Sequence, residues 1–329
     1  MVFPTKHAKY TKGTIGQQRN RNSKPDVHLK IILVYSVWFA GYKDFSLHLF
    51  FHPFLAFQGR SCYFHTIRMT DFTRIKYSVD QRICTITLSR PEKHNALDDV
   101  MIVELSSALL SAQKDNGVKI ILLTGDGDSF CAGADLAYMQ RITGFDFTQN
   151  QEDSNNLMKL FLQLYTHRKP IIAVVRGNAL AGGCGLATVC DMIVASRETA
   201  RFGYPEVKIG FIPAIVMTFL IRRVGEAKAR ELTLRGNTLT ADEAHSIGLV
   251  NMVVPETELE NASLTLATEM ARQCSSSSLG LIKELLSRIH GMSTQDALNY
   301  ASNLNALTRM TDDCKKGIDA FLKKERVKW

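Results

Sequence analysis

Apolar and polar residues follow a regular pattern from Met69 to the C-terminus. Short runs that are almost entirely apolar, typical of strands buried on both faces, alternate with longer segments whose apolar residues recur at helical spacing. From Glu256 onward only the helical spacing remains. The expected fold is therefore an α/β core, residues 69–255, followed by a helical region, residues 256–329. The predicted strands are Thr73–Val79, Ile83–Leu88, Val118–Thr124, Ile171–Val175, Met192–Ala195 and Leu249–Val254.

The helical segments begin at recognisable positions. Asp98 and Thr240 each precede a helical pattern and are residue types that cap helix N-termini. Residues 140–155 are polar and are predicted to form a mobile loop. The predicted helices are 99 to about 114, Asn156–His167, Cys184–Cys190, Ala214–Val224, Gly225–Arg235, Ala241–Ile247, Glu258–Gln273, Ser278–His290, Ser293–Arg309 and Asp312–Lys324.

Residues 1–68 differ from the rest of the chain in composition. They contain ten of the 40 Lys and Arg and two of the 32 Asp and Glu, so residues 69–329 carry 30 of each and no net charge. The formal charge of +8 therefore belongs to the first segment, and no nucleic-acid-binding motif accompanies it. Its apolar runs are shorter than the roughly 20 residues of a membrane-spanning helix. We expect an extension outside the fold. A transit peptide is the alternative, because the first thirty residues are poor in acids.

The cysteines indicate a reducing compartment. There are seven, Cys-x-x-Cys does not occur, and several lie within apolar runs. Such a scattered, odd-numbered set is typical of buried free thiols rather than of a disulfide framework or a zinc site. The expected location is the cytoplasm, or the mitochondrial matrix if residues 1–68 include a transit peptide.

The stretch Lys169–Phe211 carries the candidate chemistry. A buried strand leads through Ala181-Gly182-Gly183 into a short helix, and glycines at a helix start leave backbone N–H groups open to negative charge. Glu206 follows the apolar loop Phe202-Gly203-Tyr204-Pro205, which can hold a carboxylate partly out of water. A donor site for a developing oxyanion next to such an acid/base group indicates an enzyme.

A second segment repeats this arrangement. Val118–Thr124 is followed by a glycine-containing loop and Ala132-Gly133-Ala134, as Ile171–Val175 is followed by Gly177 and Ala181-Gly182-Gly183. Two such units side by side in a parallel sheet would present two N–H groups to one point, which is the geometry of an oxyanion hole. Small residues that merely let a helix pack on the sheet are an equally good interpretation.

Other polar residues have simpler interpretations. His94 lies in a turn-rich loop, where a solvated or structural histidine is favoured over a ligand contact. Asp135 is interpreted as a helix cap and Asp191 as a structural residue at a helix–strand junction. The third glycine of a dinucleotide fingerprint is missing after Gly125-Asp126-Gly127, and Walker A, H-E-x-x-H and G-x-S-x-G motifs are absent from the sequence.

Several motifs taken together resemble the crotonase superfamily, that is, the enoyl-CoA hydratase/isomerase family. The resemblance extends from about Met69 to the C-terminus. Its motifs are Arg90-Pro91-x-x-x-Asn95-Ala96-Leu97, Phe130-Cys131-Ala132-Gly133-Ala134-Asp135-Leu136, Lys169-Pro170-x-x-Ala173-x-Val175-x-Gly177, Ala181-Gly182-Gly183-Cys184, Cys190-Asp191, Phe202-Gly203-x-Pro205-Glu206-x-x-x-Gly210, Leu234-x-Gly236 and Ala244-x-x-x-Gly248-Leu249-Val250.

The resemblance implies a fold, partners and site residues. The fold would be a spiral of ββα units with C-terminal helices that assemble trimers or dimers of trimers. The oxyanion-hole donors would be the N–H groups of Ala134 and Gly182, and Glu206 would be the catalytic acid/base. An acyl-CoA thioester would be the substrate. Neither a metal nor a cofactor would be needed, and neither nucleic acid nor a membrane would be a partner. The substrate contacts would be Lys93, His94, Ala96, Ala132, Asp135, Leu136, Gly183 and Pro205.

Gly185 departs from the pattern of the two-glutamate hydratases, which have a Glu at this position. A single-glutamate Δ3,Δ2-enoyl-CoA isomerase is therefore one alternative, with Glu206 moving a proton between C2 and C4. Hydratases of branched or acidic enoyl-CoAs, of the methylglutaconyl type, are the closer likeness, because they resemble this chain in having Gly here and in the segment Ile212-Pro213-Ala214. A CoA-thioester-binding protein without turnover is the third possibility.

Overall fold

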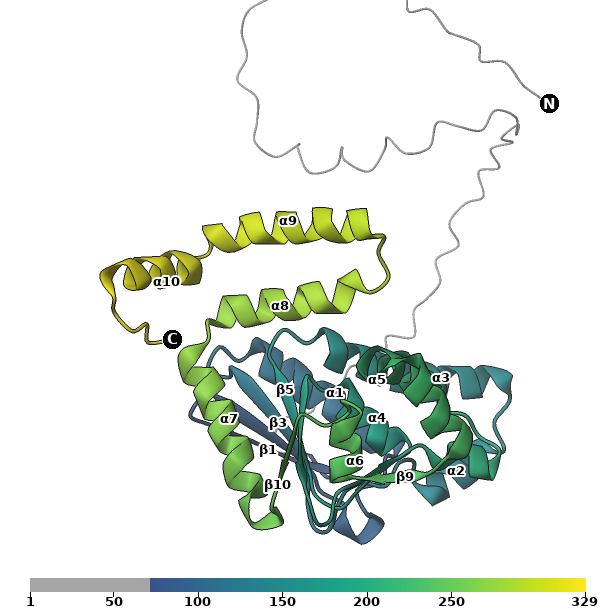
Figure 1. The fold of residues 1–329 in the computed structure, drawn as a ribbon. Coiled ribbons are helices and arrows are strands. Elements are labelled where there is room, and N and C mark those ends of the chain that lie inside the picture. Colours follow the sequence, from purple (N-terminus) through teal and green to yellow (C-terminus); the bar gives the residue numbers. More distant parts are fainter. Residues whose placement is uncertain (1–71) are drawn as a thin grey trace, which may run out of the picture. The chain divides into compact units, whose positions relative to one another are not determined.

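The structure is a computed structural model that describes residues 72–329; the predictions for residues 1–68 lie outside these residues. Its strands form two sheets (Figure 1). The six-stranded sheet contains, in spatial order, β1 (Ile75–Asp80), β2 (Ile83–Leu88), β3 (Ile120–Gly125), β5 (Ile171–Val175), β7 (Met192–Ser196) and β10 (Met252–Val254). The four-stranded sheet contains β4 (Ser129–Cys131), β6 (Asn178–Leu180), β8 (Arg201–Gly203) and β9 (Thr238–Thr240).

Consecutive strands step from the larger sheet to the smaller one. β3, β5 and β7 are parallel neighbours in the first sheet, and the strands that follow them, β4, β6 and β8, are parallel neighbours in the second. A helix follows β4 and β6, and a 3-10 helix and then α5 follow β8. This repeated strand–strand–helix unit is the expected spiral, and it places the ends of β4, β6 and β8 side by side.

The helices agree with the sequence pattern in most places. Asp98 and Thr240 cap their helices through side-chain hydrogen bonds from Met101 N and Glu243 N, as predicted. Gly225 has non-helical backbone angles inside α5, so the predicted division into two helices is confirmed. The helices are α1 (Asp99–Lys114), α2 (Leu136–Ile142), α3 (Phe147–Thr166), α4 (Gly182–Val189), α5 (Ala214–Arg235), α6 (Ala241–Ser246), α7 (Leu259–Gln273), α8 (Ser276–Ile289), α9 (Thr294–Met310) and α10 (Asp312–Lys323), with 3-10 turns η2 (Pro91–Lys93), η3 (Pro205–Ile209) and η4 (Glu256–Glu258).

The prediction of a mobile loop over residues 140–155 is wrong. α2 extends to Ile142 and α3 begins at Phe147, behind a capping box in which Asp146 and Gln149 satisfy each other's backbone N–H groups. The segment is polar because the first half of α3 is largely exposed, and its fully buried residues lie only in the second half. The last predicted strand is also shorter than expected, since Leu249 and Val250 donate to Ala244 O in a turn.

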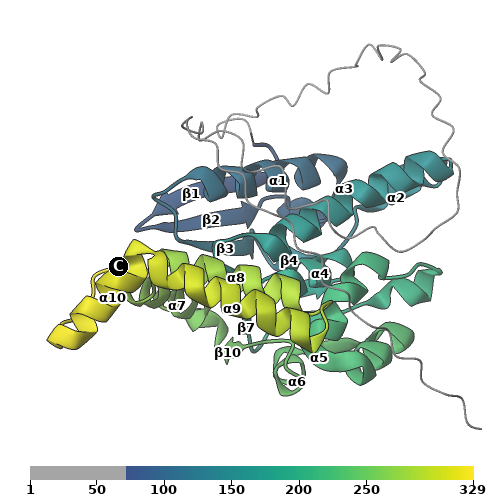
Figure 2. The same ribbon diagram turned by 90° about the horizontal axis from the view of Figure 1, so that it is seen from above.

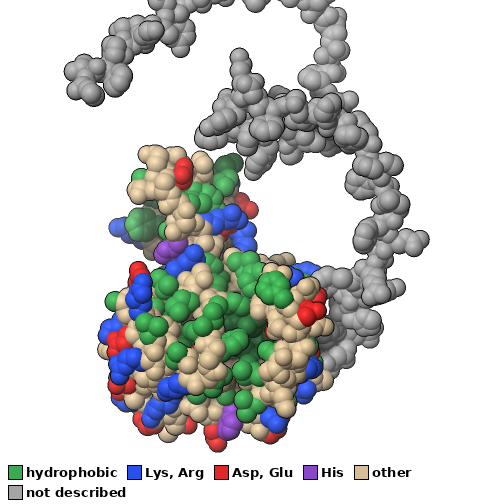
Figure 3. Space-filling model, turned by 90° about the vertical axis from the view of Figure 1, so that its right-hand side faces the viewer, with side chains coloured by type: hydrophobic (Ala, Val, Ile, Leu, Met, Phe, Trp, Pro, Cys, Tyr) green, Lys and Arg blue, Asp and Glu red, His purple; other side chains and the backbone are tan. Residues whose placement is uncertain are grey.

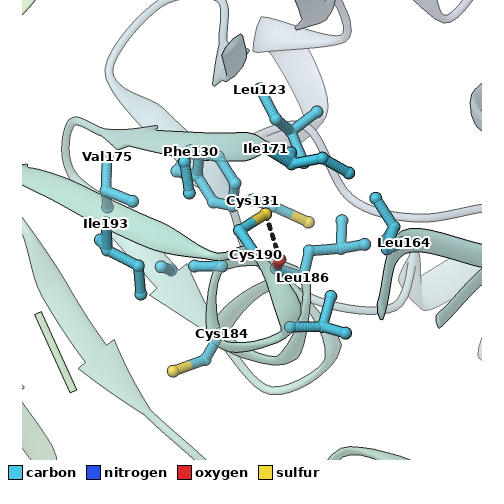
Figure 4. Packing of buried hydrophobic residues seen from close by; sticks show 14 of the residues in the cluster. Leu123, Phe130, Cys131, Leu164, Ile171, Val175, Cys184, Leu186, Cys190 and Ile193 are labelled. Carbon is cyan, nitrogen blue, oxygen red and sulfur yellow. Dashed lines mark hydrogen bonds between the residues drawn. The ribbon is translucent and has the colours of Figure 1, made fainter. Parts of the chain in front are cut away.

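Both faces of the larger sheet are covered. Ile121 and Leu123 of β3 point into a cluster with α1, α3 and α4, whereas Ile120 and Leu122 pack with α7 on the other face. Figure 4 shows part of the first cluster, in which Cys131 of β4 and Cys184 of α4 lie among aliphatic side chains. All six described cysteines are free, and four of them are buried, as predicted.

The last three helices, α8, α9 and α10, form a C-terminal arm. α9 lies alongside α8 in both views (Figures 1 and 2). The arm is joined to the core by Lys283 Nζ, which lies 2.5 Å from Asp191 Oδ2. Asp191 also accepts from Ile171 N at 2.7 Å, and the interpretation of Asp191 as a structural residue is therefore confirmed. Among residues 72–329, no helix combines the length and the apolar character needed to cross a bilayer.

Candidate active site

The two glycine-containing segments lie next to each other. β4 and β6 pair in parallel, with Cys131 opposite Ala179, and the chain continues from each strand into a helix start. A Cβ atom placed on Gly133 would lie 2.8 Å from Ala181 Cβ and 3.6 Å from Gly182 N. The expected juxtaposition of the segments that carry Ala134 and Gly182 is therefore present.

The backbone on both sides of Ala134 is fixed by Leu97. Leu97 N donates to Gly133 O at 2.7 Å, and Asp135 N donates to Leu97 O at 2.9 Å. Ala134 itself is exposed, and its N–H group donates no hydrogen bond within residues 72–329. It is a free donor on a rigid main chain.

Gly182 is the first residue of α4, and its N–H group lies at the positive end of the helix dipole. The preceding residue, Ala181, has φ 51° and ψ −127°, a conformation that costs a non-glycine residue about 1–3 kcal/mol. Ala181 N donates to Gly203 O at 2.8 Å, which ties this turn to β8. At Gly183 a Cβ would lie 2.1 Å from Cys131 O, so small residues are also needed for packing here.

Glu206 is buried beside this helix start. It lies in η3, three residues after Gly203, and is 8% exposed. Its Oε2 atom has no hydrogen-bond partner within the described residues. Burial raises the pKa of the carboxyl group, as expected for an acid/base group. Phe202 and Tyr204 are buried, so the apolar loop holds the carboxylate out of water as predicted.

Some of the predicted substrate-contact residues lie in the loops next to Ala134. His94 O accepts from Ala132 N at 3.0 Å, which joins the two loops that contain them. Lys93, His94 and Leu136 are exposed at the surface, whereas Ala96, Asp135 and Gly183 are buried and Ala132 and Pro205 are partly exposed. Asp135 caps α2, as interpreted from the sequence, by accepting from Ala137 N and Tyr138 N. Residues 72–329 contain no group of three or more acidic, His or Cys side chains placed to hold a metal ion.

Comparisons with known proteins identify the family. Residues 78–329 match the protein family described as Enoyl-CoA hydratase/isomerase. The chain belongs to this family.

Two curated members of the enoyl-CoA hydratase/isomerase family illustrate the similarity. A Thermus thermophilus protein that carries an enoyl-CoA hydratase name is 43% identical over 242 residues, which cover 74% of this chain and 95% of the relative. The Escherichia coli 2,3-dehydroadipyl-CoA hydratase is 37% identical over 248 residues, 75% and 94% of the two chains. An enoyl-CoA hydratase crystal structure from Shewanella pealeana superimposes with a TM-score of 0.75 at 29% identity, over 80% of this chain and 99% of that one.

This family member is an enzyme in which hydrocarbon side chains fill the space next to Gly185, the position at which the resemblance implies a second Glu in two-glutamate hydratases. A Cβ atom on Gly185 would lie 2.1 Å from Val216 Cγ1 and 3.0 Å from Phe161 Cε1. Val216 and Phe161 are both buried. Glu206 is the buried carboxylate of the candidate site, and side chains of α5 and α3 fill the space next to Gly185.

Sequence reasoning missed three residues next to the candidate site. Val216 and Phe161 are ordinary core residues in the sequence, and nothing in their spacing connects them with Gly185. Arg90 is part of a quoted motif but received no role; in the structure it is buried and pairs with Asp135 at 2.8 Å. The available signal was an arginine directly before Pro91 at the start of a turn-rich loop.

Proposed function

We propose that the chain hydrates the C2=C3 double bond of an α,β-unsaturated acyl-CoA. The observation that carries the proposal is the buried Oε2 of Glu206, which has no hydrogen-bond partner within the described residues. Glu206 follows the loop that is tied to the start of α4, and this helix start lies next to the segment that carries the free N–H group of Ala134. The relatives' names support hydration. The Escherichia coli name refers to an acyl group with a second, free carboxylate, which supports an acidic acyl chain. The methylglutaconyl type is the acidic and branched chain that we propose to test.

In this mechanism the substrate thioester carbonyl accepts from Ala134 N–H and Gly182 N–H. Glu206 removes a proton from water, the hydroxide oxygen bonds to C3, and the electron pair of the double bond moves to the thioester as an enolate. Glu206 then returns the proton to C2. Each donor contributes about 10²–10³ in rate, or about 3–4 kcal/mol, because it stabilises charge that develops in the transition state. The thioester is the electron sink, so no cofactor beyond the CoA of the substrate takes part in the proposal.

The site also supports a second candidate, Δ3,Δ2-enoyl-CoA isomerisation, because Gly185 leaves one carboxylate. The test is incubation with crotonyl-CoA, 3-methylglutaconyl-CoA and a 3-enoyl-CoA in deuterated water, with products analysed by mass. Addition of one water to either of the first two identifies a hydratase. A 2-enoyl product from the third without added water identifies an isomerase. Binding without turnover of any of the three would contradict both proposals.

The pH dependence follows from the raised pKa of Glu206. The group must be ionised to accept a proton from water, so activity is lost as the pH falls through this pKa. Because burial raises the pKa above 4.5, the ordinary value for this group, the acid limb of kcat/KM for crotonyl-CoA is expected above that value. Initial rates across the acid range, with circular dichroism to monitor folding, measure it. A limb at the ordinary value would contradict the role of burial.

We propose that the C-terminal arm assembles the chain into trimers or dimers of trimers. The arm carries exposed apolar side chains, which are a marker of protein interfaces; they include Leu298, Leu307, Met310, Ile318, Phe321 and Leu322. Figure 3 shows hydrophobic side chains gathered on one face of the core below the arm. Light scattering is expected to give three or six protomers, and a monomer at micromolar concentration would contradict the proposal. We place the protein in the cytoplasm, with the mitochondrial matrix as the alternative.

A further inference from the structure

Four charged side chains form a row that ends at the segment of the Ala134 donor. Arg74 Nε lies 3.2 Å from Asp98 Oδ2, Arg90 Nη1 lies 3.1 Å from the same oxygen, and Arg90 Nη2 lies 2.8 Å from Asp135 Oδ2. Asp98, Arg90 and Asp135 are all less than 9% exposed. Charges alternate along this row (Arg74, Asp98, Arg90 and Asp135), so each buried carboxylate has a cationic neighbour.

Arg90 is fixed on several sides. Its backbone N donates to Asn95 Oδ1 at 2.8 Å, and Nη1 donates to Ala96 O at 2.8 Å. Nη1 thus contacts Ala96 and Asp98, and Nη2 contacts Asp135. Burying a guanidinium group is costly unless it is paired with carboxylates and carbonyl oxygens. Because the group is planar, these partners also fix its orientation.

Arg90 joins Ala96 and Asp135, which are the sequence neighbours of the bridge residues Leu97 and Ala134. Ala96 precedes Leu97, and Asp135 follows Ala134; Leu97 and Ala134 form an isolated parallel bridge. The other carboxylate oxygen of Asp135, Oδ1, is used by Ala137 N and Tyr138 N. Oδ2 has Arg90 as its donor. Arg90 therefore links the two segments that form the bridge.

We propose that Arg90 is a positioning residue for the N–H group of Ala134. The inference rests on the proposed function, because it concerns the oxyanion hole assigned there. Arg90 acts through Ala96 and Asp135 and orients the Gly133–Ala134 peptide toward the thioester oxygen. A lysine at position 90 keeps the charge but cannot span Ala96 O and Asp135 Oδ2 at once, since its ammonium is a single point charge.

The direct readout is the polarisation of a bound thioester carbonyl. Butyryl-CoA has no double bond to hydrate, so it binds the wild-type enzyme without reacting. With ¹³C at the thioester carbonyl, difference infrared spectroscopy reports the stretching frequency in the site. The full-length wild type is expected to shift this band to lower frequency relative to free butyryl-CoA, and Arg90→Gln is expected to lose a large part of the shift.

Turnover gives the second readout. Misplacement of a reacting group by about 1 Å costs about 10²-fold in rate, so Arg90→Gln is expected to lower kcat for crotonyl-CoA about 10²-fold. The KM for crotonyl-CoA is expected to change less than kcat, because Arg90 is not itself one of the predicted substrate contacts. Arg90→Lys is expected to fall between wild type and Arg90→Gln in both readouts.

Arg74→Gln is the matched control. Arg74 belongs to the same row but contacts Asp98 and not Asp135. This variant is expected to lower the melting temperature and to leave the carbonyl band and kcat at wild-type values. It therefore separates a general loss of stability from a loss of donor orientation.

The outcomes distinguish this inference from the proposed function. If the wild type neither shifts the band nor turns over enoyl-CoA substrates, the oxyanion hole itself is refuted. If the wild type shifts the band and Arg90→Gln retains the full shift, the positioning role is refuted. Should Arg90→Gln fail to fold, Arg90→Lys decides: a band and kcat equal to those of the wild type would refute the inference.

Discussion

Glu206→Gln is expected to lower kcat for enoyl-CoA hydration by about 10³-fold, within the range of 10²–10⁴ that a general acid/base contributes. The amide has nearly the same shape as the carboxyl group but cannot accept and return the proton. The dissociation constant of butyryl-CoA is expected to stay almost unchanged, because the donors and CoA contacts remain. Loss of the enoyl thioester absorbance measures turnover, and titration calorimetry measures binding.

Glu104→Gln is the control for this experiment. Glu104 is also a buried glutamate, at 3% exposure, but its carboxylate accepts from Thr73 N and Arg74 N at the start of the described chain. Its replacement is expected to lower stability and leave kcat unchanged. If Glu206→Gln instead retained turnover within tenfold of the wild type, the single-carboxylate mechanism would be wrong.

Gly185→Glu is expected to destabilise the protein rather than to create a two-glutamate site. The Cβ alone would overlap Val216 Cγ1 at 2.1 Å, and overpacking costs about 1–3 kcal/mol. The carboxylate would then enter a buried apolar cluster, which adds a desolvation cost of several kcal/mol. Since native proteins are stable by about 5–15 kcal/mol, we expect little folded protein, as judged by urea denaturation and soluble yield.

The double variant Gly185→Glu with Val216→Ala tests whether overlap with Val216 causes the loss of stability. Removing Val216 Cγ1 opens the space that the new side chain needs, so the pair is expected to be more stable than Gly185→Glu alone. Val216→Ala by itself measures the cost of the cavity. Additive effects in this double-mutant cycle would contradict the assignment of Val216 as the residue that fills the space next to Gly185.

Local signals in the sequence predicted much of the fold. The caps at Asp98 and Thr240 and the division of α5 at Gly225 are properties of a few consecutive residues, and they were found in the expected places. The juxtaposition of the Ala134 and Gly182 segments could be predicted from their repeated pattern, because parallel sheets place equivalent strand ends together. The polar start of α3 was mistaken for a loop, since an exposed helix held by a capping box has little apolar periodicity.

Contacts between distant segments could not be predicted in this way. Val216 meets Gly185 only because α5 crosses α4, and Arg90 meets Asp135 only because two loops share a bridge. The residues around each of them in the sequence would look the same if the contact did not exist. A glutamate missing at position 185 was visible in the sequence, whereas the hydrocarbon that replaces it was visible only in three dimensions.

The glycines of α4 limit how this enzyme can diverge. Gly183 lies against the main chain of Cys131 on one side, and Gly185 lies against Val216 and Phe161 on another. A larger residue in a protein core is tolerated best when a neighbouring side chain becomes smaller. Gly183 does not allow such a compensation, because the group that it contacts is main chain. The separation of the two donor segments is therefore set by main-chain contact. The spacing of these two segments can be inherited unchanged while the side chains of the surrounding core continue to vary.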